Sequence, residues 1–186
     1  MLSRRLARPL GIALAVSAAL SFNAVAGETT SVLAVTASVA QNCLISTNAV
    51  AFGSYDPVVT NNASGAALNG TGSVTVTCTR SSTGVTIALG LGSHAAGSTR
   101  RMTGGATGAY LAYELYQPSA ATPAATCTFP GATVWNAAGS GLFTPSGVAD
   151  WGAASPKTFN VCGTVPRGQD AAADSYTDSV IATINF

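Results

Sequence analysis

The sequence predicts an all-β protein, more specifically an immunoglobulin-like β-sandwich. Short runs rich in Val, Thr, Ile, Tyr and Phe alternate with clusters of Gly, Asn, Ser and Pro. In residues 73–79 apolar side chains alternate with threonines, which is typical of a sheet with one buried and one solvated face. No window of helical length after residue 26 keeps an apolar stripe with a period of 3.6 residues. Several such strands with polar connections favour a sandwich.

The expected strands cover residues 31–40, 73–79, 85–91, 109–116, 157–165 and 178–186. In the last of them one face carries Val180, Ala182, Ile184 and Phe186. The opposite face carries residues 181, 183 and 185. Soluble proteins normally blunt an apolar edge strand with charges, prolines or a covering segment. We therefore expect this strand to pair with another chain.

Residues 1–26 have the features of a signal peptide. Three arginines precede the apolar residues 10–22, a stretch too short to span a bilayer as a helix. Ala24, Val25 and Ala26 form a small-residue cleavage site, so we expect cleavage after Ala26. The remaining residues suit one domain and contain no further long apolar run. We expect no integral membrane segment after cleavage.

The charge pattern argues against nucleic acid as a partner. The formal net charge is +1, and three of the eight cations lie in the signal peptide. The mature chain keeps Arg80, Arg100, Arg101, Lys157 and Arg167. Scattered cations of this kind do not form a stripe that follows a phosphate backbone.

Four cysteines in an exported chain predict two disulfides. Three pairings are possible. We favour Cys43 with Cys78 and Cys127 with Cys162, because both pairs join strand-like segments at the same spacing in sequence. Each would contribute roughly 3 to 4 kcal/mol in the chain-entropy model. A zinc site is the weaker interpretation, since the chain has no CxxC and one histidine.

No pattern indicates an enzyme, a metal site or a cofactor. His94 lies in a glycine-rich turn without a carboxylate nearby in sequence, so a catalytic triad could arise only from distant strands. The stretch GLGSHA lacks the third glycine of a phosphate loop and a following helix. Asp170, Asp174 and Asp178 lack the spacing of a calcium loop, and we interpret them as polar caps before the final strand.

Five aromatic side chains leave a sugar-binding surface open as an alternative to core packing. They are Trp135, Trp151, Tyr110, Tyr113 and Tyr116. The three tyrosines recur at every third position, so they cannot share one face of a strand. We favour the core for the tryptophans and expect at least one tyrosine to point outward.

Six stretches of the chain resemble the spore coat protein U domain family, which includes the archaic (Csu-type) chaperone-usher pilins. They are NCLISTNAVAFGSYDP, GTGSVTVTCT, RRMT, YLAYELYQ, DWG and GTVPRGQDAAADSYTDSVIATINF. The most specific parts are residues 52–56, 163–169 and 176–180. Cys162 departs from the family, which more often has another residue there.

The resemblance implies an immunoglobulin-like domain, residues 43–186, that lacks its last strand. A periplasmic chaperone would lend a strand to the resulting groove, beside the strand that ends at Phe186, until the next subunit replaces it at an outer-membrane usher. Residues 27–42 would be the donor extension, with Leu33, Val35, Ala37 and Val39 on one face. Residues 29–40 would reach about 40 Å when extended. On the residues alone, the same segment could be the first strand of its own domain.

Three functional classes follow. The first is a structural subunit of a secreted surface fibre with a role in adhesion or biofilm, exported through the periplasm to the cell surface, with copies of itself or related pilins as partners. The second is a secreted spore-coat or matrix protein of the same family that forms no pilus. The third is a carbohydrate-binding adhesin or a hydrolase, which the residues favour least.

Overall fold

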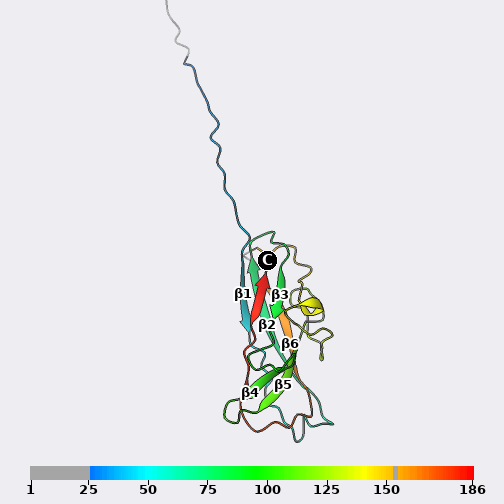
Figure 1. The fold of residues 1–186 in the computed structure, drawn as a ribbon. Coiled ribbons are helices and arrows are strands. Elements are labelled where there is room, and N and C mark those ends of the chain that lie inside the picture. Colours follow the sequence, from blue (N-terminus) through cyan, green and yellow to red (C-terminus); the bar gives the residue numbers. More distant parts are fainter. Residues whose placement is uncertain (1–25, 153–154) are drawn as a thin grey trace, which may run out of the picture. The chain divides into compact units, whose positions relative to one another are not determined.

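The computed structural model describes residues 26–152 and 155–186 (Figure 1). The predicted signal peptide lies outside the described residues except for Ala26. The chain divides into two units, Met1–Ala37 and Ser38–Phe186, and each is described separately.

Residues 26–42 form no regular secondary structure. The strand expected over residues 31–40 is therefore wrong for the chain on its own. Its apolar side chains are uncovered, since Leu33 and Val35 are each 86% exposed and Val39 is 83% exposed. Ala37 is exposed as well. A segment with the alternation of a strand thus has no strand partner among the described residues.

The second unit contains two antiparallel sheets (Figure 1). The larger has the order β1-β2-β6-β5-β4-β7. Its strands are β1 (Cys43–Asn48), β2 (Leu68–Cys78), β4 (Arg100–Gly104), β5 (Tyr110–Tyr116), β6 (Lys157–Val165) and β7 (Tyr176–Thr177). The smaller sheet pairs β3 (Thr86–Leu89) with β8 (Ala182–Asn185). A 3-10 turn, η1 (Gly139–Gly141), is the only helical element in the described ranges, and the all-β sandwich prediction is confirmed.

The final strand is shorter than predicted, because β8 covers four residues and residues 178–181 precede it. The Gly90 N–H donates to the Ile181 carbonyl, and the Ser93 N–H donates to the Ser179 carbonyl. Between these two hydrogen bonds, residues 91 and 92 on one side thus lie opposite residue 180 on the other, which is the arrangement of a β-bulge and interrupts regular pairing. Strands β1, β4 and β7 were not among the predicted segments.

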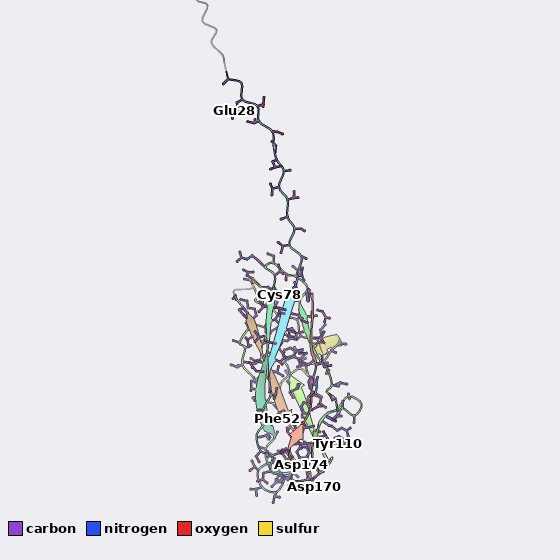
Figure 2. All side chains as sticks on the ribbon, turned by 90° about the vertical axis from the view of Figure 1, so that its left-hand side faces the viewer. Glu28, Phe52, Cys78, Tyr110, Asp170 and Asp174 are labelled. Carbon is purple, nitrogen blue, oxygen red and sulfur yellow. A yellow bond between two sulfur atoms is a disulfide. The ribbon has the colours of Figure 1, made fainter. Side chains whose placement is uncertain are left out.

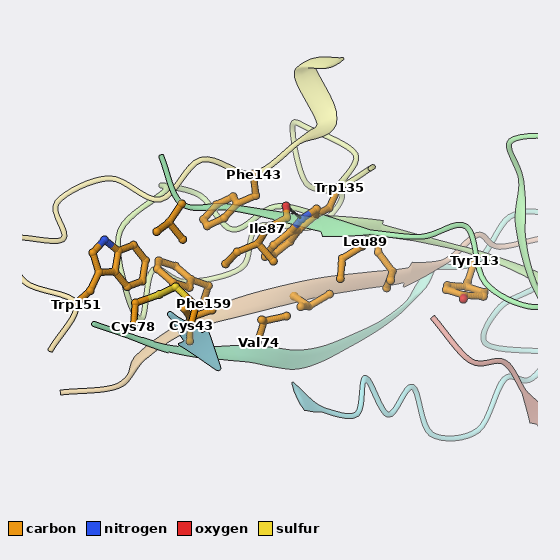
Figure 3. Packing of buried hydrophobic residues seen from close by; sticks show 14 of the residues in the cluster. Cys43, Val74, Cys78, Ile87, Leu89, Tyr113, Trp135, Phe143, Trp151 and Phe159 are labelled. Carbon is orange, nitrogen blue, oxygen red and sulfur yellow. Dashed lines mark hydrogen bonds between the residues drawn. A yellow bond between two sulfur atoms is a disulfide. The ribbon is translucent and has the colours of Figure 1, made fainter. Parts of the chain in front are cut away.

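The core lies between the two sheets and under the loop that follows β5 (Figure 3). Trp135 and Phe143 have ring centroids 4.5 Å apart, and Phe143 and Phe159 have centroids 5.2 Å apart. Trp135 also donates its indole N–H to the Ile87 carbonyl at 2.9 Å. With Trp151 buried too, the core interpretation of both tryptophans is confirmed.

The predicted alternation in β2 is also confirmed. Val74, Val76 and Cys78 are buried, whereas the threonines between them are partly exposed. Tyr110 is 50% exposed while Tyr113 is buried, so one tyrosine does point outward.

Both disulfides join the pairs that the sequence favoured. Cys43 and Cys78 lie directly opposite each other and join β1 to β2. Cys127 and Cys162 join the long loop after β5 to β6. The first bond therefore fixes an edge strand to its neighbour, and the second fixes the loop that covers the core.

Candidate strand-binding groove

Two neighbouring strands, β1 and β8, each have one unpaired edge within the described part of the chain. β1 pairs with β2, and β8 pairs with β3. β1 and β8 run close to each other, yet no hydrogen-bonded ladder joins them (Figure 1). Each strand has room for a partner on the side that faces the other.

The main chain of β8 directs hydrogen-bonding groups to this open side. The Ile181 carbonyl accepts from Gly90 on the β3 side. Along a strand, successive residues turn their N–H and C=O groups to opposite edges. Val180, Ala182 and Ile184 therefore present these groups to the open edge.

The same reasoning applies to β1. The Thr79 N–H donates to the Asn42 carbonyl at 2.8 Å, on the β2 side. Cys43, Ile45 and Thr47 consequently turn their N–H and C=O groups away from β2. A strand placed between β1 and β8 would find donors and acceptors on both of its edges.

A groove of about 310 Å³ lies beside these edges. Its apolar lining includes Val50, Val74, Leu89, Leu115, Val161 and Ala182. Among the predicted groove residues, Val180 and Ala182 line it, and Ile184 packs against the core. Phe186 lies beyond the end of β8, is 51% exposed and does not line the groove.

A larger cleft of about 880 Å³ continues from the groove. The two share Val50, Phe52, Met102 and Tyr176 in their linings. The cleft lies between the loop after β1 and residues 170–176, and Leu111 contributes to its lining. The apolar surface available to a partner therefore extends beyond the two edge strands.

The floor shared by groove and cleft depends on opposed glycines in β2 and β6. Gly70 and Gly163 face each other in the ladder. A Cβ atom at Gly163 would lie 2.6 Å from Val50 Cγ1 and 2.7 Å from Phe52 Cζ. Only glycines leave room for residues 50–52 to lie flat on this face of the sheet.

A buried carboxylate, Asp178, closes one part of the groove. Its Oδ1 accepts from the main-chain N–H groups of Ser93 (2.9 Å) and His94 (3.2 Å) and lies 3.0 Å from His94 Nδ1. Its Oδ2 accepts from the Tyr113 hydroxyl at 2.7 Å. His94 has no carboxylate near it in sequence, as expected, but the fold brings Asp178 to it from 84 positions away. Asp178 thus joins residues 93 and 94 to Tyr113 through hydrogen bonds and is not simply a polar cap.

Ionisation in this cluster follows from burial and hydrogen bonding. Burial opposes ionisation of Asp178, but the hydrogen bonds from Tyr113 and His94 outweigh it and hold the pKa of that carboxyl below its usual value. Burial, followed by the hydrogen bond to Asp178, raises the pKa of the Tyr113 hydroxyl. The pair is therefore a neutral phenol that donates to a carboxylate.

The other two aspartates of the predicted set remain near the protein surface. Asp174 accepts hydrogen bonds from the Ala106 N–H and from both the N–H and the hydroxyl of Thr107. The Thr107 hydroxyl, followed by its N–H, lowers the pKa of Asp174 to about 2. Asp174 therefore caps the turn between β4 and β5 and not the start of the final strand, whereas Asp170 is exposed. The described ranges hold no group of three potential metal ligands.

Arg100 is a positioning residue that the sequence did not reveal. Its side chain is fully buried and donates to the carbonyls of Leu89, Gly90 and Trp135. It also pairs with Glu114. These bonds hold the end of β3 beside β8 and the groove, but no local pattern distinguishes a buried arginine from an exposed one.

The family model for the Spore Coat Protein U domain matches residues 29–183, which include β1, the residues that line the groove and the first half of β8. The chain belongs to the spore coat protein U domain family. Its sequence is 44% identical over 142 residues to Protein U of Myxococcus xanthus, covering 73% of this chain and 70% of that protein.

The solved structures add a more distant similarity. The family member matches, with 16% identity and a TM-score of 0.47, a chain in the crystal structure of the CsuC-CsuE chaperone-tip adhesion subunit pre-assembly complex from archaic chaperone-usher Csu pili of Acinetobacter baumannii. The match covers 80% of this chain and spans 40% of that chain. In the ranges that the structure describes, no helix is both long and apolar enough to cross a membrane.

Proposed function

We propose that this family member is a structural subunit of a secreted surface fibre, assembled by the chaperone-usher route through donor-strand exchange. The observation that carries the proposal is the apolar groove between the open edges of β1 and β8. An added strand there would gain main-chain hydrogen bonds from both edges, with side-chain pockets for specificity.

The donor is residues 27–42 of the next copy. Leu33, Val35, Ala37 and Val39 share one face of this segment and are exposed in the isolated chain. Placing that face in the groove would bury apolar surface at about 25 cal/mol per Å². The groove of one copy and the segment of another are thus complementary in chemistry.

The proposed assembly begins with export of the chain. Residues 1–26 direct the chain to the periplasm, where a chaperone occupies the groove of the 43–186 domain. An outer-membrane usher then exchanges the chaperone for the donor segment of a neighbouring copy or a related pilin. The fibre stands on the cell surface and serves adhesion or biofilm formation.

Deleting the donor segment tests the proposal. The mature chain, residues 27–186, should form oligomers that resist detergent and dissociate on heating, whereas the chain without residues 28–40 should remain a folded monomer. Circular dichroism confirms folding, and unheated gel electrophoresis counts the oligomers. A mature chain that stays monomeric at all concentrations contradicts the proposal.

The second candidate is a secreted coat or matrix protein without a fibre. The family description, Spore Coat Protein U domain, and the identity with Protein U favour it. In that case residues 28–40 would fold back as the first strand of their own domain. Their deletion would then unfold the chain, an outcome that separates the two candidates.

A further inference from the structure

We infer that an exposed turn of one copy packs into an apolar pocket of the neighbouring copy, so that the two bodies touch each other in addition to the donor strand. The turn is residues 57–60, here called the valine turn. The pocket has a volume of about 230 Å³ and is called the tryptophan pocket, after Trp151 in its lining. The inference rests on the proposed function and adds a second contact surface to it.

The valine turn carries two adjacent apolar side chains that the described chain leaves uncovered. Val58 is 78% exposed and Val59 is 70% exposed. Single apolar side chains are common on protein surfaces. An adjacent pair on one turn instead offers a partner a compact apolar contact.

Hydrogen bonds within the loop fix the shape of the valine turn. Asp56 Oδ1 accepts from the N–H groups of Val58 (2.9 Å) and Val59 (3.1 Å). The side-chain amide of Asn62 donates to the carbonyls of the same two valines. The buried Asn61 side chain accepts from the Asp56 N–H at 2.8 Å. A turn that is already ordered loses little conformational entropy on binding, so its two valines are prepared for a partner.

The tryptophan pocket matches this turn in chemistry. Val85 and Trp151 are buried, and together with Pro145 and Val148 they give the pocket its apolar lining. None of the described residues that line the pocket carries a charge. Valine side chains would therefore fill it without burying an unpaired polar group.

The tryptophan pocket lies where the donor segment joins the body. The Gln41 side chain donates to the Thr83 carbonyl at 3.0 Å, and the next residue, Gly84, lines the pocket. The Trp151 carbonyl accepts from the Cys78 N–H at 3.2 Å. The pocket is thus next to the base of the donor segment.

The valine turn lies at the opposite end of the body. Val58 lines the 880 Å³ cleft together with Asp170 and Asp174, and both aspartates lie far from Cys78 (Figure 2). A contact between opposite ends of identical copies joins two different surfaces, so it can repeat from copy to copy along an open fibre. Turn and pocket therefore suit a fibre and not a closed dimer.

Both surfaces are continuous with the proposed donor-strand interface. The pocket adjoins the base of the donor segment, and the turn borders the cleft that continues from the groove. A donor segment that fills groove and cleft brings its own body to the cleft end of the acceptor, because the acceptor's other end carries its own donor segment. The tryptophan pocket of the donor copy then meets the valine turn of the acceptor.

The contact is too small to join two copies without the donor strand. Two valine side chains cannot bury the roughly 1,200 Å² that a stable interface needs. Once the donor strand links two copies, the second contact forms within one assembly and benefits from a high effective concentration. The chain without residues 28–40 should therefore remain monomeric although it keeps both surfaces.

A disulfide between copies tests the contact in the full mature chain, residues 27–186. The variant combines Val59→Cys with Thr144→Cys, since Thr144 is an exposed residue in the lining of the pocket. After mild oxidation of the polymers, boiled samples on a non-reducing gel should show a ladder that collapses to the monomer on reduction. Peptide mapping should place the new bond between residues 59 and 144. Adding Val58→Asp should abolish the ladder, because a carboxylate would enter the pocket without a partner.

Leu44→Cys combined with Thr144→Cys is the matched control. Leu44 is 69% exposed, as Val59 is 70% exposed, but it lies in β1 outside the valine turn. Boiling should release this variant as monomers. Circular dichroism checks that each variant folds. If polymers form but the Val59→Cys, Thr144→Cys chain gives no more ladder than the control, or a ladder bonded elsewhere, the contact is refuted while the proposed function stands. A mature chain that never polymerises overturns both.

Discussion

The Tyr55 hydroxyl donates to the Pro166 carbonyl at 3.0 Å and accepts from the Gln169 N–H at 2.9 Å. The same hydroxyl also lies 3.1 Å from the main-chain carbonyl oxygen of Asn61. Two of the three stretches that most resemble the family, residues 52–56 and 163–169, therefore meet at one phenol. This bond network holds the loop after β1 against the loop after β6, and both loops border the cleft.

Replacing Tyr55 with Phe should destabilise the domain by about 1 to 2 kcal/mol, because the Gln169 N–H and the loop carbonyls lose a partner. Urea unfolding measures the change. Tyr110→Phe is the control, since Tyr110 is half exposed and the described residues offer its hydroxyl no hydrogen-bond partner. It should shift the free energy of unfolding by less than about 0.5 kcal/mol, and equal effects of the two variants would contradict the role of Tyr55.

Gly163→Ala should lower stability by about 1 to 3 kcal/mol, because the new methyl group would overlap Val50 and Phe52. Removing part of the overlap with Phe52→Leu in the same chain should not restore stability fully, since the Val50 contact remains. Gly105→Ala is the control, because its Cβ would meet nothing within 4 Å. Thermal unfolding distinguishes the two, and a harmless Gly163→Ala would show that residues 50–52 do not rest on this glycine.

Asp178→Asn should destabilise the domain at pH 7 by about 1 to 3 kcal/mol, because an amide cannot accept every hydrogen bond that the carboxylate accepts. The folded-state pKa of Asp178 is lowered. Its contribution is therefore present above the ordinary carboxyl pKa near 3.9 and is lost as the pH falls through the lower folded-state value. The difference between the two proteins should shrink below about pH 4.

Urea unfolding at several pH values measures this difference. Asp170→Asn serves as the control, since the exposed Asp170 carboxylate has no hydrogen bond in the described structure. Its effect should stay small at every pH. A difference between Asp178→Asn and the unchanged chain that persists at pH 2 would show that the carboxylate charge is not the stabilising feature.

Much of the fold could be predicted because the pattern of a half-buried strand is local. Val74 and Val76 alternate with threonines, and that alternation alone indicates which face is buried. β4 was not predicted, because it begins with an arginine. Arg100 can be buried only because carbonyls on β3 and in the loop after β5 accept its hydrogen bonds. Segment 31–40 shows the reverse case, since it has a strand pattern but no described strand pairs with it.

The candidate site was less predictable, because it depends on pairs far apart in sequence. Asp178 and His94 meet across the bulge between β3 and β8, and no local motif indicates this contact. The apolar face of the last strand did indicate Val180 and Ala182 as lining residues. The same pattern also indicated Phe186, but Phe186 does not line the groove, because regular pairing with β3 ends at Asn185.

A peptide can replace the donor segment if the groove binds strands. The chain without residues 28–40, mixed with a synthetic peptide of residues 29–40, should gain about 2.7 kcal/mol of stability at a peptide concentration a hundred times the dissociation constant. Val35→Asp in the peptide should abolish the gain, because a carboxylate would enter an apolar slot without a partner. Thr36→Asp is the matched control: residue 36 lies on the opposite face of the strand, so its carboxylate stays in water and most of the gain should remain. Thermal melting at increasing peptide concentration measures all three. Equal shifts for Val35→Asp and the unchanged peptide would show that residues 33–39 do not enter the groove in the proposed orientation.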